Sequence, residues 1–258
     1  MKVAFPNMGY LGIPVVNMLK RLGAEVVATP PTTKSTVGIG ALYSPEGVCL
    51  PYKITMGNLL EAMDGGADTF VTVCGAGKCR LGFYNAIQKI QLEQRRAINF
   101  YAIDTNNLFG SLYRFLRDIT PQTPGTEVLR QMALAVKSLQ ALDALNEAKS
   151  RYGSRSKMPG RVIDMVNDSM PAFGHCLSWR EIQDKRDTIM ELLKPLADDT
   201  APEPPKVALV GELYLLLEPY VNHYIEDVLV KQGVEVRKFV HTGEWAYANI
   251  LLSKLGLY

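Results

Sequence analysis

Two cysteines lie directly before predicted helices, where a protein favours the thiolate form. Cys49 precedes Pro51, which marks the first turn of a helix, and Cys79 follows the glycine loop 75–78 before another helix. The positive end of a helix dipole stabilises a thiolate. Two such thiolates from neighbouring loops could together bind a soft metal or an iron–sulfur cluster. The alternative is that both are buried, inert thiols, because cysteine is among the most buried residue types.

The other two cysteines give a weaker signal. Cys74 ends the strand 68–74, five positions before Cys79, and it either faces the same loop or packs in the core, which we favour slightly. Cys176 follows His175 in a helical region, where packing is the more common role of a single cysteine. No paired C-x₂-C units are present, so the spacing disfavours a structural zinc ribbon.

Two nucleotide-binding motifs are only partly present around residues 75–79. A phosphate loop needs glycine where Thr72 stands and serine or threonine where Cys79 stands. The same segment begins as G-x-G, but Arg80 replaces the third glycine of a dinucleotide fingerprint. The sequence therefore supports neither ATP nor NAD binding.

The remaining polar candidates favour structural roles. The three histidines, at positions 175, 223 and 241, do not form a Ser-His-Asp arrangement. Asp104 and Glu212 each follow a predicted strand, where a turn-forming role is the more common one.

Composition sets wider limits. The chain has 258 residues, of which 47% are hydrophobic and 21% charged, and this excludes wholesale disorder. A net charge of +2 gives no argument for nucleic acid or an acidic partner. No apolar run reaches the ~18–20 residues of a membrane span. The N-terminus is typical of a strand rather than a signal peptide, so we expect a cytoplasmic protein.

Strands alternate with helices over residues 1–107. This pattern predicts an α/β domain with a doubly wound parallel sheet and helices on both faces. The strands are expected at 2–5, 24–28, 68–74 and 100–103, and the helices at 13–22, 53–63 and 81–96.

Residues 108–196 are predicted to be mainly helical. One helix should start near Pro124, and Ser178 with Glu181 has capping-box spacing before another. A basic stretch lies between them and is interpreted as a solvated connector, with a patch for a phosphate-bearing ligand as the alternative. It contains Lys149, Arg151, Arg155, Lys157 and Arg161.

Residues 197–205 form the clearest linker, and the start of the chain recurs after it. Lys206-Val207-Ala208 repeats Lys2-Val3-Ala4, and the segment 233–236 repeats 23–26, with six more residues between the two marks. This weak internal repeat predicts a second, similar α/β domain over 206–258. By length, that domain looks incomplete.

The segments around Cys49 and Cys79 resemble a known family. Residues 43–58 (YSPEGVCLPYKITMGN) and 75–84 (GAGKCRLGFY) resemble the 2-hydroxyacyl-CoA dehydratase D-component-like family. More closely, they are similar to its branch of acyl-CoA dehydratase activase-related proteins, also described as CoA-substrate-specific enzyme activases. The segments 30–34 and 210–222 are similar to that branch as well.

The resemblance implies two flavodoxin-like α/β domains with an iron–sulfur cluster of the 4Fe-4S type between them. In that family two ligands come from first-domain loops, which match Cys49 and Cys79, while Gly75 and Gly77 would let backbone N–H groups approach the sulfurs. The third comes from a Pro-Phe-Thr-Cys-Met-Pro stretch that this sequence lacks. Either Cys74, Cys176 or a partner chain would replace that ligand, or the site is vestigial.

The chemistry implied by the resemblance is low-potential electron transfer in anaerobic metabolism. An ATP-hydrolysing activase reduces the cluster, which passes an electron to an acyl-CoA. Related double-cubane proteins reduce small molecules instead. The expected partners are an activase, such a substrate, and a second copy or another subunit that completes the site. The alternative is a non-catalytic binding or assembly module of the same fold with an incomplete cluster site.

Overall fold

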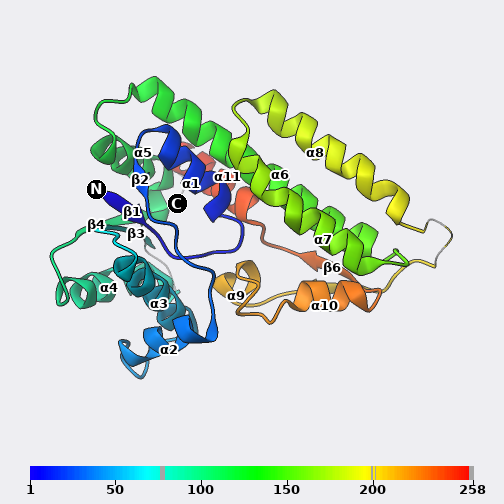
Figure 1. Ribbon diagram of the computed structural model, residues 1–258, viewed down its shortest axis with the longest axis horizontal. Coiled ribbons are helices and arrows are strands. Elements are labelled where there is room, and N and C mark those ends of the chain that lie inside the picture. Colours follow the sequence, from blue (N-terminus) through cyan, green and yellow to red (C-terminus); the bar gives the residue numbers. More distant parts are fainter. Residues whose placement is uncertain (76–78, 199, 201, 256–258) are drawn as a thin grey trace. The chain divides into compact units, whose positions relative to one another are not determined.

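The computed structural model describes residues 1–75, 79–198, 200 and 202–255. The chain packs into two compact units. Figure 1 labels the helices and strands. The first contains residues 1–7, 18–132 and those from 247 on, and the second contains residues 8–17 and 133–246. The boundaries predicted from the sequence divide the chain into consecutive blocks, whereas each unit combines stretches that are separated in sequence.

The first unit contains a four-stranded parallel sheet. Its strands follow the order β2-β1-β3-β4, and every neighbouring pair is parallel. This confirms the predicted α/β class with helices around a parallel sheet, and the order is consistent with a flavodoxin-like fold. The strands are β1 (Lys2–Ala4), β2 (Glu25–Val26), β3 (Thr69–Cys74) and β4 (Asn99–Asp104).

Helices follow or connect these strands, mostly where the periodicity predicts them. They are α1 (Gly12–Arg21), α2 (Lys34–Leu42), α3 (Leu50–Asp64), the 3₁₀ helix η1 (Arg80–Phe83), α4 (Tyr84–Glu93), the 3₁₀ helix η2 (Thr105–Asn107) and α5 (Leu108–Ile119). Helix α1 begins in the second unit and ends in the first. The sequence did not indicate α2, because two glycines within nine residues lower its helix propensity.

Helix α2 forms because it is capped and because it packs closely on α3. The Thr33 hydroxyl accepts a hydrogen bond from the Thr36 N–H, and the Thr33 N–H donates to the Thr36 hydroxyl. A Cβ at Gly40 would lie 1.7 Å from the carbonyl oxygen of Lys53, so only glycine permits this approach. The close contact fixes α3 and therefore the cysteine just before it.

The core of the first unit lies around α3. This helix is buried on most of its surface and packs with β3 and α4. The largest fully buried side chains of this core are Tyr52, Met56, Leu59, Leu60, Phe70 and Leu92. A helix held on several faces gives its N-terminal residue a fixed position.

The second unit is mainly helical. Its elements are α6 (Gly125–Gly153, which begins in the first unit), α7 (Pro159–Ser169), the 3₁₀ helix η3 (Met170–His175), α8 (Trp179–Leu193), the 3₁₀ helix η4 (Lys194–Leu196), β5 (Lys206–Leu209), α9 (Leu213–Leu217), α10 (Ile225–Lys231), β6 (Glu235–Lys238) and α11 (Thr242–Leu255, which ends in the first unit). As predicted, α6 begins just after Pro124 and the Ser178 hydroxyl caps α8. Within the described ranges, no helix is long and apolar enough to cross a membrane.

The internal repeat also appears in the strand pairing. Strands β5 and β6 are parallel, as β1 and β2 are, and the repeated residues pair in the same register. Lys2 lies opposite Glu25, and Lys206 lies opposite Glu235. Two equivalent β-α-β segments are therefore present, of which the second forms a two-stranded sheet in the described part of the chain.

Candidate functional site

Cys49 occupies the N-cap position of α3. Its backbone is extended, with φ −71° and ψ 159°, and its side chain makes no capping hydrogen bond, so the sulfur is not used to close the helix. The thiol is half-buried, and its Sγ lies in hydrogen-bonding contact with the hydroxyl of Tyr84. Pro51 lies in the first turn of the helix, as the sequence predicts.

Cys79 has a similar position in the next loop. It is the N-cap residue of η1, which leads directly into α4, and it also makes no side-chain capping bond. Its thiol is exposed. The Gly82 N–H donates to the Cys79 carbonyl at 3.3 Å, which closes the short helix behind the cysteine.

Gly75 shapes the start of the same loop. A Cβ there would lie 2.1 Å from the Thr105 hydroxyl, so a side chain would push the loop away from Thr105, the first residue of η2. The Gly75 N–H donates to the Gly82 carbonyl at 3.4 Å. Gly77, the other predicted glycine, lies outside the described residues.

Two contacts hold the cysteine loops beside each other. The Arg80 guanidinium donates to the Gly47 carbonyl at 3.3 Å, and the Tyr84 hydroxyl contacts Cys49. Both side chains follow Cys79 in sequence and reach the loop that carries Cys49. These contacts of Arg80 and Tyr84 could not be predicted, because a contact across 33 or 35 positions leaves no periodic pattern in the sequence.

Cys74 has a different environment. It is the last residue of β3 and lies opposite Asp104 of β4 in the parallel ladder. Burial raises the pKa of its thiol, and the nearby Asp104 carboxylate adds to the shift. A raised pKa favours the neutral thiol, so without a metal Cys74 is poorly prepared to act as a ligand.

The described residues bring no complete ligand set together. No group of three or more histidine, cysteine, aspartate or glutamate side chains in the described ranges is arranged to hold a metal ion. Cys176 is buried in the core of the second unit, among residues such as Phe173 and Ile182, which confirms the packing role predicted for it. Cys49 and Cys79 therefore fit part of a thiolate set rather than a whole one.

The polar residues at strand ends have the structural roles expected of them. The Asp104 carboxylate accepts from the Asn106 N–H at 2.9 Å, and the Glu212 carboxylate accepts from the Leu215 N–H at 3.0 Å. Both are therefore turn or helix caps. His241 is buried and forms an ion pair of 3.1 Å with Glu147 when it is protonated.

The basic stretch of the second unit divides into two kinds of residue. Lys157 is 87% exposed and pairs with Asp198, as expected of a solvated connector. For Lys149 that interpretation is wrong, because its side chain is only 8% exposed and pairs with Asp227 at 2.6 Å. The sequence could not show this, since the partner lies 78 positions away.

Comparison of the chain with protein-family models, curated proteins and solved structures found no match in any of the three sets. The family resemblance of the cysteine segments thus remains a prediction.

Proposed function

We propose that the chain binds an iron–sulfur cluster, of the 4Fe-4S type that the resemblance implies, and takes part in low-potential electron transfer. One observation carries the proposal. Cys49 and Cys79 both occupy N-cap positions, neither sulfur is used in capping, and Arg80 joins their two loops. A bound cluster would supply the one-electron chemistry.

The residues around Cys49 are suited to a ligand thiolate. Cys49 lies at the N-terminus of α3, where the partial positive charge of the first N–H groups would stabilise the negative charge of a bound cluster. The Tyr84 hydroxyl would donate to that sulfur, and a hydrogen bond to a ligand sulfur is one of the ways in which a protein tunes the reduction potential. The apolar core beneath α3 limits solvent access on that side.

The remaining ligands would come from a partner chain. Three apolar side chains, Phe83, Ile87 and Ile90, follow Cys79 at helical spacing and remain exposed. Apolar groups gathered on one helix face often mark a protein interface. We propose that a second copy of the chain covers this face and that Cys49 and Cys79 of the two copies complete the set of four thiolates.

The wider role follows the resemblance. Electrons would come from an ATP-dependent activase and pass to an acyl-CoA or another small molecule. The protein would then be a component of a 2-hydroxyacyl-CoA dehydratase-like or double-cubane-type enzyme. A cytoplasmic location fits this role, because that compartment keeps thiols reduced.

The second candidate function is a binding or assembly module without redox chemistry. The observation that favours it is the absence of three converging ligand side chains in the described ranges. The two functions differ in whether the chain takes up iron and sulfide.

Anaerobic reconstitution separates them. The full chain would be incubated with ferrous iron, sulfide and dithiothreitol, desalted, and assayed for iron, sulfide and visible absorption. We expect stoichiometric iron and sulfide in the wild type and in Cys176→Ala, and loss of both in Cys49→Ala and Cys79→Ala. Native mass spectrometry would give the number of chains per cluster, which tests the proposed partner role of a second copy.

Cys176→Ala is the matched control because it removes a thiol that is buried in another core. A colourless wild-type chain after reconstitution would overturn the proposal. Equal iron uptake by all four proteins would also overturn it, because the metal would then be bound elsewhere.

A further inference from the structure

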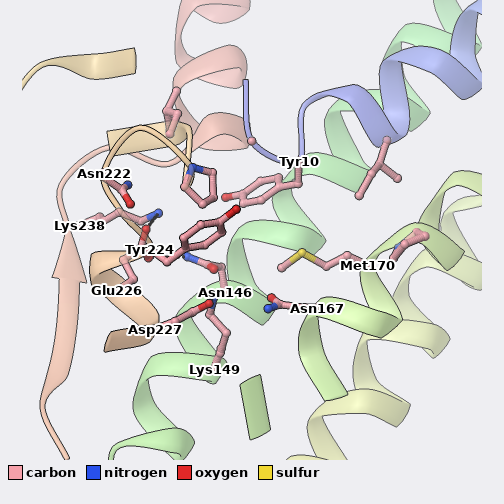
Figure 2. Close-up of a pocket in the computed structure, with 15 residues that line it drawn as sticks. Tyr10, Asn146, Lys149, Asn167, Met170, Asn222, Tyr224, Glu226, Asp227 and Lys238 are labelled. Carbon is pink, nitrogen blue, oxygen red and sulfur yellow. Dashed lines mark hydrogen bonds and ion pairs between the residues drawn. The ribbon is translucent and has the colours of Figure 1, made fainter. Parts of the chain in front are cut away.

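The second unit contains a partly open cavity of about 280 Å³. Side chains from α6, α7, α10 and β6 converge on it, together with Tyr10 and the loop that carries Asn222 and Tyr224 (Figure 2). It is lined by Gly9, Tyr10, Ile13, Asn146, Lys149, Asn167, Met170, Pro171, Leu217, Pro219, Asn222, Tyr224, Glu226, Asp227 and Lys238. All of these residues belong to the second unit, so the cavity is independent of the cysteine loops.

Two buried ion pairs lie in the cavity wall. Lys149 pairs with Asp227 at 2.6 Å, and Lys238 pairs with Glu226 at 2.8 Å. None of these four side chains is more than 17% exposed. Buried charges are costly unless they are paired, and the two pairs make the wall neutral overall.

The charged groups retain capacity for further hydrogen bonds. An ammonium group has three N–H donors, and in the described part of the chain Lys149 and Lys238 each have one carboxylate partner. The Asn146 amide donates to the second oxygen of Glu226 at 3.0 Å. Apart from its ion pair with Lys149, the buried Oδ1 of Asp227 has no hydrogen-bond partner among the described residues. The wall therefore offers cationic donors and an anionic acceptor at the same time.

The rest of the lining is largely apolar. Ile13, Met170 and Leu217 contribute hydrocarbon or thioether surface to the same space. The volume corresponds to roughly nine water molecules at ~30 Å³ each, which is enough for a small molecule of about ten non-hydrogen atoms. A ligand that fills the cavity would thus need a charged end and an apolar end.

The loop beside the cavity has an unusual backbone. His223 and Tyr224 are consecutive non-glycine residues with φ of 57° and 56°, in the left-handed region that costs about 1 kcal/mol or more per residue. Strained residues of this kind occur preferentially at ligand sites. Here the strained backbone carries a tyrosine of the cavity wall.

We propose that this cavity binds a free α-amino acid with an apolar side chain. The carboxylate of such a zwitterion would accept from the lysine ammonium groups, and its ammonium group would donate to Asp227. The side chain would pack against Ile13, Met170 and Leu217. A ligand with one charge only would leave that charge uncompensated in a neutral wall, at a cost that a zwitterion avoids.

Isothermal titration calorimetry on the full chain tests the proposal. Leucine, isoleucine, valine, methionine and phenylalanine would be titrated, followed by inorganic phosphate and by the two single-charge analogues of leucine. These are 4-methylpentanoate, which lacks the ammonium group, and 3-methylbutylamine, which lacks the carboxylate. We expect at least one of the amino acids to bind. If another amino acid binds more tightly than leucine, its analogues without the ammonium group and without the carboxylate would be titrated as well. Each analogue of the tightest-binding amino acid should bind at least tenfold more weakly than that amino acid.

A double variant tests the location. Lys149→Met with Asp227→Asn removes one ion pair without leaving a buried unpaired charge, so the chain should still fold. We expect at least tenfold weaker binding of the best amino acid. The same two substitutions in the pair of exposed Lys157 and half-buried Asp198, neither of which lines the cavity, are the matched control and should leave binding unchanged.

Three results would overturn the proposal. The first is no binding of any of the five amino acids. The second is binding of 4-methylpentanoate or inorganic phosphate as tight as that of the best amino acid, which would define an anion site. The third is equal binding by the folded double variant and the wild type, which would place the site elsewhere.

Discussion

The two β-α-β repeats of the chain have the same strand pairing but different loops. In the strand ladders, Lys2 lies opposite Glu25 in the first copy and Lys206 lies opposite Glu235 in the second. In each copy a glycine with positive φ, Gly23 at 88° and Gly233 at 75°, precedes the second strand. These shared features determine the fold of the repeat.

The differences between the copies coincide with the candidate sites. The sheet of the first copy continues into β3 and β4, and the loop after β3 carries Cys79. The second copy has a longer connection that contains α9 and α10, and α10 supplies Glu226 and Asp227 to the cavity. The comparison indicates that the two copies share one scaffold and differ in the connections that carry the two candidate sites, as is common in α/β proteins.

The largest effect is expected from breaking an ion pair that only the second copy has. Lys238→Met would leave Glu226 buried beside the cavity without its cation, and we expect it to lower the free energy of unfolding by about 3–5 kcal/mol. Lys238→Met with Glu226→Gln should recover most of that loss. Urea denaturation followed by circular dichroism measures both, and a double variant as unstable as the single one would contradict the pairing.

A smaller loss is expected in the helix pair that positions Cys49. A Cβ at Gly57 would lie 2.1 Å from the carbonyl oxygen of Thr36, so Gly57→Ala must separate α2 from α3. We expect a loss of about 2 kcal/mol, together with faster alkylation of Cys49. Gly38→Ala, on the open side of α2, is the matched control and should instead stabilise by about 0.5–1 kcal/mol.

The two repeat glycines test the equivalence of the copies. Gly23→Ala and Gly233→Ala should each cost about 1–2 kcal/mol, because both residues have positive φ and neither has an atom in close contact with an added Cβ. The two costs should agree within about 0.5 kcal/mol. A clearly larger cost in one copy, in the same urea experiments, would show that the turns are not equivalent.

The smallest effect concerns pH. Burial raises the pKa of Glu218 above its ordinary value of 4.5, although the Gly9 N–H donates to its carboxylate at 2.8 Å and opposes the shift. The contribution of protonated Glu218 to the free energy of unfolding is fully present below pH 4.5. It is lost as the pH rises through the raised pKa, because the buried carboxylate then becomes charged. Glu218→Gln cannot ionise, so the wild type should lose stability relative to this variant as the pH rises from 4.5. A constant difference across that range would contradict the shift.

Much of the fold could be predicted because it is encoded locally. The apolar strands and the helices between them follow from short-range periodicity, and the repeat from matching residues. Helix α2 could not be predicted, because its glycines disfavour an isolated helix and are favourable only against α3.

In the candidate sites, too, the features with local signals could be predicted and those that depend on distant segments could not. Cys49 and Cys79 could be placed before helices from Pro51 and from the loop glycines, which are local signals. The contact between Cys49 and Tyr84, and the pair of Lys149 with Asp227, depend on distant segments that meet only in the fold.

Whether Cys49 and Cys79 are cluster ligands is tested most directly by the reactivity of each thiol with iodoacetamide. This reactivity would be measured by peptide mass spectrometry before and after anaerobic loading with iron and sulfide. We predict that Cys49 and Cys79 become protected together on loading and that buried Cys176 reacts slowly in both states. If Cys49 and Cys79 react as fast in the loaded chain as in the metal-free chain, the two cysteines are not cluster ligands and the proposed function is wrong.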